Sequence, residues 1–160
     1  TGRLMLVPQA IQDGFTAATN AVRGATLRLP DQPAPIGSFT EPEYAQVGLT
    51  EAKARERHEV LTARIDFDST TRTIIDGRTN GFCKLVVDRP TRIILGCHVV
   101  GERAVEITQI AAVAMSANML VDQLAQVPLS FPTYAGVLGL AAAKATRMLN
   151  LNSDATPTRS

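Results

Sequence analysis

The sequence has little net charge, few cysteines and no long apolar run. Sixteen basic and fifteen acidic residues leave a formal net charge of +1. The chain therefore has neither the basic surface of a nucleic-acid binder nor an acidic disordered tail. Its longest apolar run covers residues 110–115, whereas a membrane span needs ~20 residues. We expect no nucleic-acid partner and no membrane span.

Two cysteines, Cys83 and Cys97, are too few for a disulfide scaffold, so a reducing cytoplasm is the expected location. They fall on the two arms of a predicted hairpin, where the strand register decides whether they face each other. Free buried thiols are the favoured state.

Several site motifs are missing as well. His58 and His98 have no further ligands at metal-binding spacing, so we expect no metal site, and His58 is expected to be solvated. The chain has no glycine-rich phosphate loop and no nucleophile elbow. It also begins without Met and without a signal-peptide pattern, so we expect it to start within a longer protein.

Periodicity predicts helices at both ends and strands in the middle. Residues 8–23 form an amphipathic helix with a break at Gly14, and residues 25–35 form an extended loop. A strand follows at about 43–48, then a charged helix over 51–58 with Thr50 as its N-cap. Residues 60–67 alternate between apolar and polar side chains, which indicates a half-buried strand.

The second half of the chain favours a hairpin followed by helices. Residues 69–80 are polar and rich in turn signals, and residues 82–87 and 93–100 have the spacing of an antiparallel hairpin. Helices are predicted over 103–119, 121–125 and 133–149, the first of them apolar nearly all round from Ile110 onward. This order indicates an α+β fold with an antiparallel sheet covered by helices.

Five stretches of the chain together resemble one protein family. They are residues 39–51 (FTEPEYAQVGLTE), 81–86 (GFCKLV), 94–101 (ILGCHVVG), 104–107 (AVEI) and 129–136 (LSFPTYAG). The pattern is similar to the C-terminal dimerisation domain of the pyridine nucleotide-disulfide oxidoreductases, which include dihydrolipoamide dehydrogenase and mercuric reductase. The resemblance implies the FAD/NAD-linked reductase dimerisation-domain fold.

The last of these stretches departs from the family pattern His-Pro-Thr-x-x-Glu. In the family, the His and Glu form an acid–base pair that serves the partner subunit. Phe131 and Gly136 occupy the His and Glu positions here, and neither residue exchanges protons. The resemblance therefore assigns no catalytic residue to this chain, and Tyr134 occupies a variable position of the motif.

The first residues resemble the end of the family's FAD-binding domain. Met5, Leu6, Val7 and Pro8 align with residues that touch the flavin, so the resemblance implies FAD contacts there in the full-length parent. An uninvolved leftover segment is the alternative. The expected organisation is a remnant of the FAD-binding domain and crossing loop at 1–35, a dimerisation domain at 36–150 and a flexible tail at 151–160.

The resemblance implies a homodimeric interface domain of an FAD- and NAD(P)H-dependent oxidoreductase that lacks the His–Glu pair. Its partners would be the FAD-binding and NAD(P)-binding domains of the parent chain. FAD and NAD(P) would belong to the parent, and we expect no cofactor and no enzymatic activity for the fragment. The alternatives are a same-family flavoenzyme of the transhydrogenase or mercuric reductase type, and a non-catalytic dimeric scaffold with the same fold.

Overall fold

The computed structural model describes residues 4–29 and 32–153, which fall into two units divided after Ala34. The first unit contains one helix, α1 (Val7–Arg23). Pro8 stands in its first turn, and Gly24 ends it with a positive φ of 81°. The predicted break at Gly14 is wrong, because α1 runs through that residue. A glycine inside a helix costs only about 1 kcal/mol relative to alanine.

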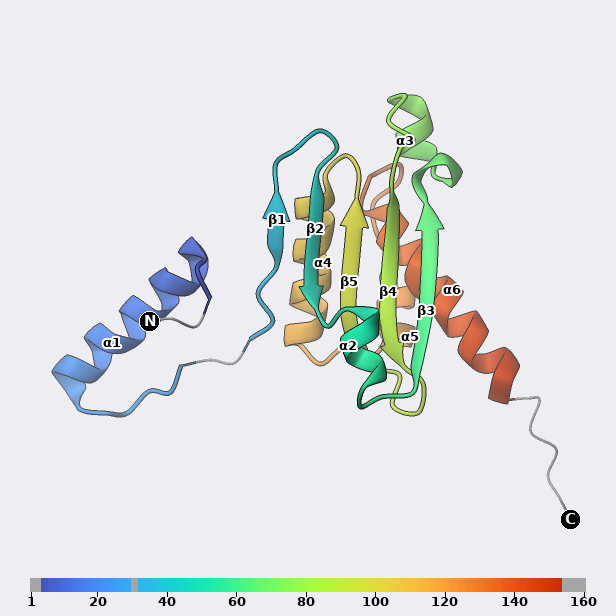
Figure 1. The fold of residues 1–160 in the computed structure, drawn as a ribbon. Helices are drawn as coiled ribbons and strands as arrows, with labels where there is room; N and C mark the ends of the chain where they lie inside the picture. Colours follow the sequence, from blue (N-terminus) through green and yellow to red (C-terminus); the bar gives the residue numbers. More distant parts are fainter. Residues whose placement is uncertain (1–3, 30–31, 154–160) are drawn as a thin grey trace, which may run out of the picture. The chain divides into compact units, whose positions relative to one another are not determined.

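A five-stranded antiparallel sheet forms the centre of the second unit (Figure 1). Its spatial order is β1-β2-β5-β4-β3, so β1 and β3 are the edges. The strands are β1 (Ile36–Ser38), β2 (Tyr44–Gly48), β3 (Val60–Asp66), β4 (Phe82–Asp88) and β5 (Ile94–Val100). The predicted hairpin is confirmed as β4 and β5, and the predicted α+β class with an antiparallel sheet is confirmed as well.

Helices cover one face of this sheet almost completely. α4 (Ala104–Ser116) packs on β2 and β5, and α6 (Gly136–Ser153) packs on β3 and β4 with α5 (Val121–Gln126) beside it. All three lie behind the strands in Figure 1, whereas the short helix α2 (Glu51–Arg55) lies in front. Thr50 caps α2 as predicted, because its hydroxyl accepts a hydrogen bond from the Lys53 amide at 3.3 Å.

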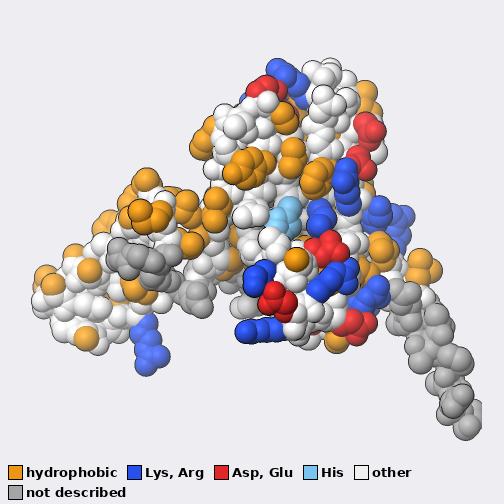
Figure 2. All heavy atoms as spheres, viewed as in Figure 1, with side chains coloured by type: hydrophobic (Ala, Val, Ile, Leu, Met, Phe, Trp, Pro, Cys, Tyr) orange, Lys and Arg blue, Asp and Glu red, His pale blue; other side chains and the backbone are white. Residues whose placement is uncertain are grey.

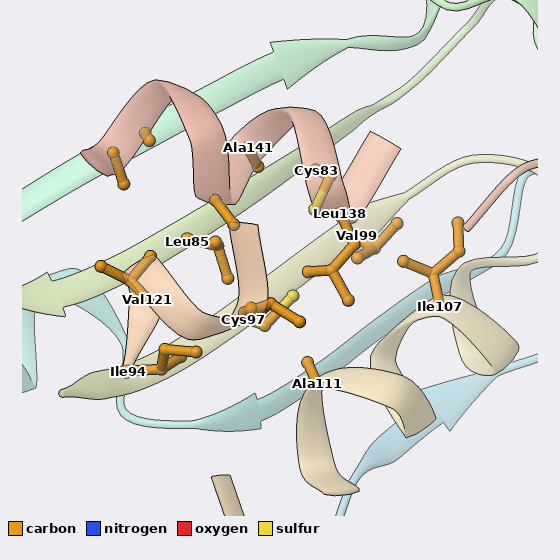
Figure 3. Close-up of a cluster of buried hydrophobic side chains, with 14 of the residues drawn as sticks. Cys83, Leu85, Ile94, Cys97, Val99, Ile107, Ala111, Val121, Leu138 and Ala141 are labelled. Atoms are coloured by element: carbon orange, nitrogen blue, oxygen red, sulfur yellow. The ribbon is translucent and has the colours of Figure 1, made fainter. Parts of the chain in front are cut away.

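The hydrophobic core lies between the sheet and the three covering helices (Figure 3). Every second residue of a strand enters it, as the two-residue period of a pleated strand requires. Burying one large aliphatic side chain contributes about 1.5–3 kcal/mol, so this layer dominates the stability of the unit. Its members include Val47, Leu61, Ala63, Leu85, Val99, Ile107, Ala111, Leu138 and Ala141.

The strand register places the two cysteines on the core side of the sheet. Cys83 lies opposite Val99 and Cys97 lies opposite Leu85, so the two thiols are diagonal neighbours on adjacent strands. Both are free and fully buried, as predicted. A hydrogen bond with Cys97, together with burial, raises the pKa of the Cys83 thiol well above its usual value.

The opposite face of the sheet is mixed in character. Lys84 pairs with Glu51 of α2 at 2.8 Å, and the Arg64 guanidinium lies 4.2 Å from the centre of the Phe82 ring. Figure 2 shows basic and acidic side chains intermixed over α2 and the strands next to it. This face therefore carries many charges of both signs and little net charge.

Several boundaries differ from the sequence predictions. Strand β1 lies where no strand was expected, because its short IGS sequence has no alternation and is held by pairing to β2. Residues 69–80, predicted as turns, contain the end of a 3₁₀ turn (Phe67–Ser69) and the short helix α3 (Thr71–Ile75). Phe67 itself is buried as predicted, but it belongs to the 3₁₀ turn.

The last two long helices also differ from expectation. α6 begins at Gly136, later than the predicted residue 133, and continues to Ser153, so residues 151–153 are helical where a tail was expected. The rest of the predicted tail, residues 154–160, lies outside the described residues. In α4, Ala111, Ala112 and Ala114 are buried within the subunit, but Val113 is exposed, so the helix is not buried all round.

Candidate functional site

Residues 129–135 form most of the segment between α5 and α6 and are hereafter called the Phe131 loop. Phe131 stands at its exposed part, with 81% of its surface accessible. The Phe131–Pro132 peptide bond is cis, and the Thr133 hydroxyl donates a 2.7 Å hydrogen bond to the Ser130 carbonyl oxygen.

Tyr134 anchors the Phe131 loop to α3 and the core. Its hydroxyl donates a 2.9 Å hydrogen bond to Asp76 Oδ2, and its ring centre lies 6.4 Å from that of Phe67. The hydrogen bond from Tyr134, with help from Arg72, lowers the pKa of Asp76. Burial and the Asp76 carboxylate raise the pKa of Tyr134. At neutral pH Tyr134 is therefore a protonated donor committed to Asp76, and it is a poor proton acceptor.

Gly136 opens α6 and leaves empty space where a side chain would stand, since an added Cβ would meet nothing within 4 Å. Thr133, where the sequence predicted the helix to begin, lies three residues before α6, and its hydroxyl donates to the Ser130 carbonyl oxygen. The loop therefore carries neither an imidazole nor a carboxylate at these positions.

The two histidines lie elsewhere in the second unit. His58 is exposed, as expected, and its Nδ1 lies 3.2 Å from Asp88 Oδ1. His98 Nε2 is 3.0 Å from the Leu49 carbonyl oxygen. Among the residues that the structure describes, no three His, Cys, Asp or Glu side chains are grouped to hold a metal ion. No helix in the same residues is long and apolar enough to cross a membrane.

A polar pocket of about 440 Å³ lies beside the Phe131 loop. It is open to the surface and takes residues from α3, from the segment after α3, from the start of α4 and from the loop itself. Its lining residues are Arg72, Asp76, Arg78, Glu102, Arg103, Pro132, Thr133 and Tyr134. Sequence reasoning missed this pocket, because its charged residues are scattered over 32 positions and three of them, Arg72, Asp76 and Arg78, stand in the segment predicted as turns.

The predicted flavin-contacting residues lie in the first unit. Met5 is 96% exposed, Val7 and Pro8 are also exposed, and Leu6 is partly covered. Three of them, Met5, Leu6 and Val7, line an open apolar pocket of about 550 Å³ together with Leu4, Ala10, Asp13, Gly14 and Ala17. On the same helix, Gln9 and Asp13 are buried and joined by a 2.9 Å hydrogen bond. The cofactor contact itself stays a prediction.

Comparisons with known proteins identify the second unit. A sequence model of the family described as "Pyridine nucleotide-disulphide oxidoreductase, dimerisation domain" matches residues 34–142. The chain is 35% identical to the mercuric reductase of Bacillus cereus over 133 residues, which cover 82% of this chain and 21% of that protein. It is 34% identical to the dihydrolipoyl dehydrogenase of Synechocystis sp. over 143 residues, which cover 86% of this chain and 30% of that protein.

Solved structures show the same fold. The HOCl-induced flavoprotein disulfide reductase RclA from Escherichia coli superposes with a TM-score of 0.82 at 23% identity, over 89% of this chain and 33% of that chain. LpdA from Mycobacterium tuberculosis superposes with a TM-score of 0.80 at 27% identity, over 89% of this chain and 31% of that chain. The chain thus spans a fifth to a third of the length of these relatives. It belongs to the pyridine nucleotide-disulphide oxidoreductase family, of which residues 34–142 are the dimerisation domain.

Proposed function

We propose that this chain forms an isologous homodimer and serves as the interface domain of a cytoplasmic FAD- and NAD(P)H-dependent oxidoreductase that lacks the His–Glu acid–base pair. The exposed ring of Phe131 carries the proposal, because 81% of it is accessible on the loop that matches the family's acid–base motif. Phe39, Val113 and Leu140 add further exposed apolar surface to the second unit. Such surface is stabilised when a partner covers it.

The chemistry of the Phe131 loop limits what the parent enzyme does. An imidazole held by a carboxylate shuttles a proton that lets a thiolate attack or leave, and such help is typically worth ~10²–10⁴ in rate. Phe131 supplies no proton, Gly136 supplies no carboxylate, and Tyr134 is bound to Asp76. We therefore propose that the parent passes hydride from a nicotinamide to FAD and then to an acceptor other than a disulfide.

The test compares two acceptors in the flavoenzyme that contains this domain. We expect slow reduction of lipoamide and glutathione disulfides, and efficient NAD(P)H-dependent reduction of a quinone or an artificial dye. The double substitution Phe131→His with Gly136→Glu should raise disulfide turnover relative to Phe131→Ala, while dye reduction stays the same in both. Disulfide turnover comparable to that of the relatives, and unaffected by Phe131→Ala, would prove this interpretation of the motif wrong.

A mercuric reductase type of parent is the second candidate, because mercuric reductases are among the similar curated proteins. In that case the acceptor would be Hg(II). Hg(II)-dependent oxidation of NADPH by the flavoenzyme distinguishes this candidate from a parent that reduces only quinones or dyes. A polypeptide that dimerises but carries no flavin would instead be the non-catalytic scaffold.

A further inference from the structure

Tyr134 joins the Phe131 loop to a segment that lies 58 residues earlier in the chain. Its hydroxyl donates a 2.9 Å hydrogen bond to Asp76 Oδ2 at the end of α3, and Arg72 Nε donates to the same oxygen at 2.8 Å. The hydrogen bond from Thr133 to Ser130, by contrast, stays within the loop. The Tyr134 side chain therefore fixes the position of the loop relative to α3.

Helix α3 is itself anchored to the core, although it has only five residues. The Phe67 carbonyl oxygen accepts hydrogen bonds from the hydroxyls of Thr70 and Thr73, and both threonines are buried. The Phe67 ring is fully buried and lies 6.4 Å from the ring of Tyr134, centre to centre. Asp76 therefore stands on a helix whose own position is set by buried contacts.

The loop thus carries one anchored aromatic side chain and one exposed aromatic side chain. Tyr134 packs against the core, whereas Phe131, three residues earlier, is 81% exposed. At neutral pH the Tyr134 hydroxyl is protonated and the Asp76 carboxylate is ionised. A hydrogen bond with one charged partner is roughly twice as strong as one between neutral groups. Side chains that are ordered before association lose less conformational freedom when a partner binds.

We propose that Tyr134 and Asp76 are positioning residues for the homodimer, because their hydrogen bond holds the Phe131 loop where its exposed ring meets the second copy of this chain. The inference rests on the proposed homodimer. The second copy is the expected occupant, since residues 34–142 match a dimerisation domain. The two residues act through the loop and need no contact with the partner subunit themselves.

Dimer dissociation constants from sedimentation equilibrium of the 160-residue chain test the proposal. Tyr134→Phe removes the hydroxyl and keeps the ring, and Asp76→Ala removes the acceptor, so each should raise the dissociation constant about 5–10-fold. Asp76→Asn keeps an oxygen acceptor for the phenol and should have a smaller effect. Asp122→Ala is the matched control and should change nothing, because its carboxylate is 24% exposed against 27% for Asp76 and is likewise paired with an arginine.

A double substitution separates positioning from a general loss of stability. If Tyr134 acts by holding Phe131, then Tyr134→Phe should not change the dissociation constant further once Phe131→Ser has removed the ring. A general loss of stability would instead add to the effect of Phe131→Ser, because independent effects are additive.

The outcomes distinguish this proposal from the homodimer on which it rests. A dimer that Phe131→Ser weakens and Tyr134→Phe leaves unchanged would overturn the positioning role and leave the homodimer intact. Additive effects of the two substitutions, or equal weakening by Asp122→Ala, would overturn it as well. A monomeric unsubstituted chain would overturn the homodimer and the positioning role together. Weakening by Tyr134→Phe that disappears in the Phe131→Ser background supports the proposal.

Discussion

Asp88 shows how single polar residues hold the β4–β5 hairpin together. Its almost fully buried carboxylate accepts hydrogen bonds from the Thr91 hydroxyl and, at 3.3 Å, from the Thr91 amide, and it lies 3.2 Å from His58 Nδ1. The hydrogen bond from the Thr91 side chain is the largest cause of the lowered pKa of Asp88. A depressed carboxyl pKa contributes stability that is present above the unfolded value of about 3.9.

We predict that Asp88→Asn lowers the free energy of unfolding at pH 7 by about 1 kcal/mol or more, because the charged acceptor is lost. The difference in the free energy of unfolding between the variant and the unsubstituted chain should narrow below pH ~4. It should disappear as the pH falls through the pKa that Asp88 has in the folded chain. Urea denaturation across pH 3–7 measures this difference, and Asp68→Asn is the control because Asp68 is exposed. A gap that stays constant across this range would contradict the pairing.

The two core cysteines give a second prediction at this scale. Cys83 and Cys97 are fully buried, and the pKa of Cys83 is raised by its neighbour and by burial, so the reactive thiolate is scarce. We predict that neither thiol reacts with Ellman's reagent within minutes in the folded chain, and that both react at once in guanidinium chloride. Rapid labelling of the folded chain with one thiol per molecule would show that the core opens or that the register is different.

Helix α6 begins with Gly136, a residue of low helix propensity. Gly136 has no neighbouring atom where a Cβ would stand, and its φ is not in the left-handed region. Gly136→Ala should therefore raise the free energy of unfolding by about 0.4–1 kcal/mol, chiefly by restricting the unfolded chain. Gly96→Ala is the contrasting variant, because its Cβ would lie 2.2 Å from the Leu49 carbonyl oxygen and destabilise the sheet. Denaturant midpoints measure both changes, and a destabilising Gly136→Ala would refute this description of the helix start.

Elements with strong periodicity were predictable from the sequence, and elements held by tertiary contacts were not. The alternation of Leu61, Ala63 and Ile65 predicted β3 and its buried side, because a pleated strand repeats every two residues. By contrast, β1 exists through its pairing with β2, and α3 is a five-residue helix too short to leave a periodic pattern. The pocket beside the Phe131 loop depends on that short helix, so its residues could not be brought together before the fold was known.

The resemblance to the family supplied what periodicity alone does not. The resemblance implies that Phe131 and Gly136 stand at the family's His and Glu positions. In the structure the Phe131 side chain is exposed, and a Cβ added to Gly136 would meet no atom within 4 Å. The sequence leaves open whether Cys83 and Cys97 face each other, because a one-residue slip in register moves every side chain to the other face of the sheet. The observed register places them as diagonal neighbours. Local sequence patterns thus predict the sheet and the helices that cover it. The surface pocket depends on contacts between segments that are distant in the sequence.

The second unit carries exposed apolar side chains that the proposed partner subunit would cover. The covered face of the sheet is filled from within the subunit, because the small residues of α6 (Ala141, Ala142 and Ala145) are buried in its own core. The exposed apolar residues lie elsewhere, among them Phe39, Val113 and Phe131. A stable two-fold interface buries about 1,200–2,000 Å² in total, and these residues are the candidates for its centre.

Sedimentation equilibrium of the purified chain at micromolar concentration is the direct test of the proposed homodimer. We predict a dimer with twice the 17.1 kDa mass of the chain, and a shift toward monomer in Phe131→Ser, because an exposed aromatic anchor is lost. Arg55→Ser in α2 is the control, which should leave the dimer unchanged. A single species of 17.1 kDa up to about 100 μM, where interfaces of this size are normally occupied, would contradict the account.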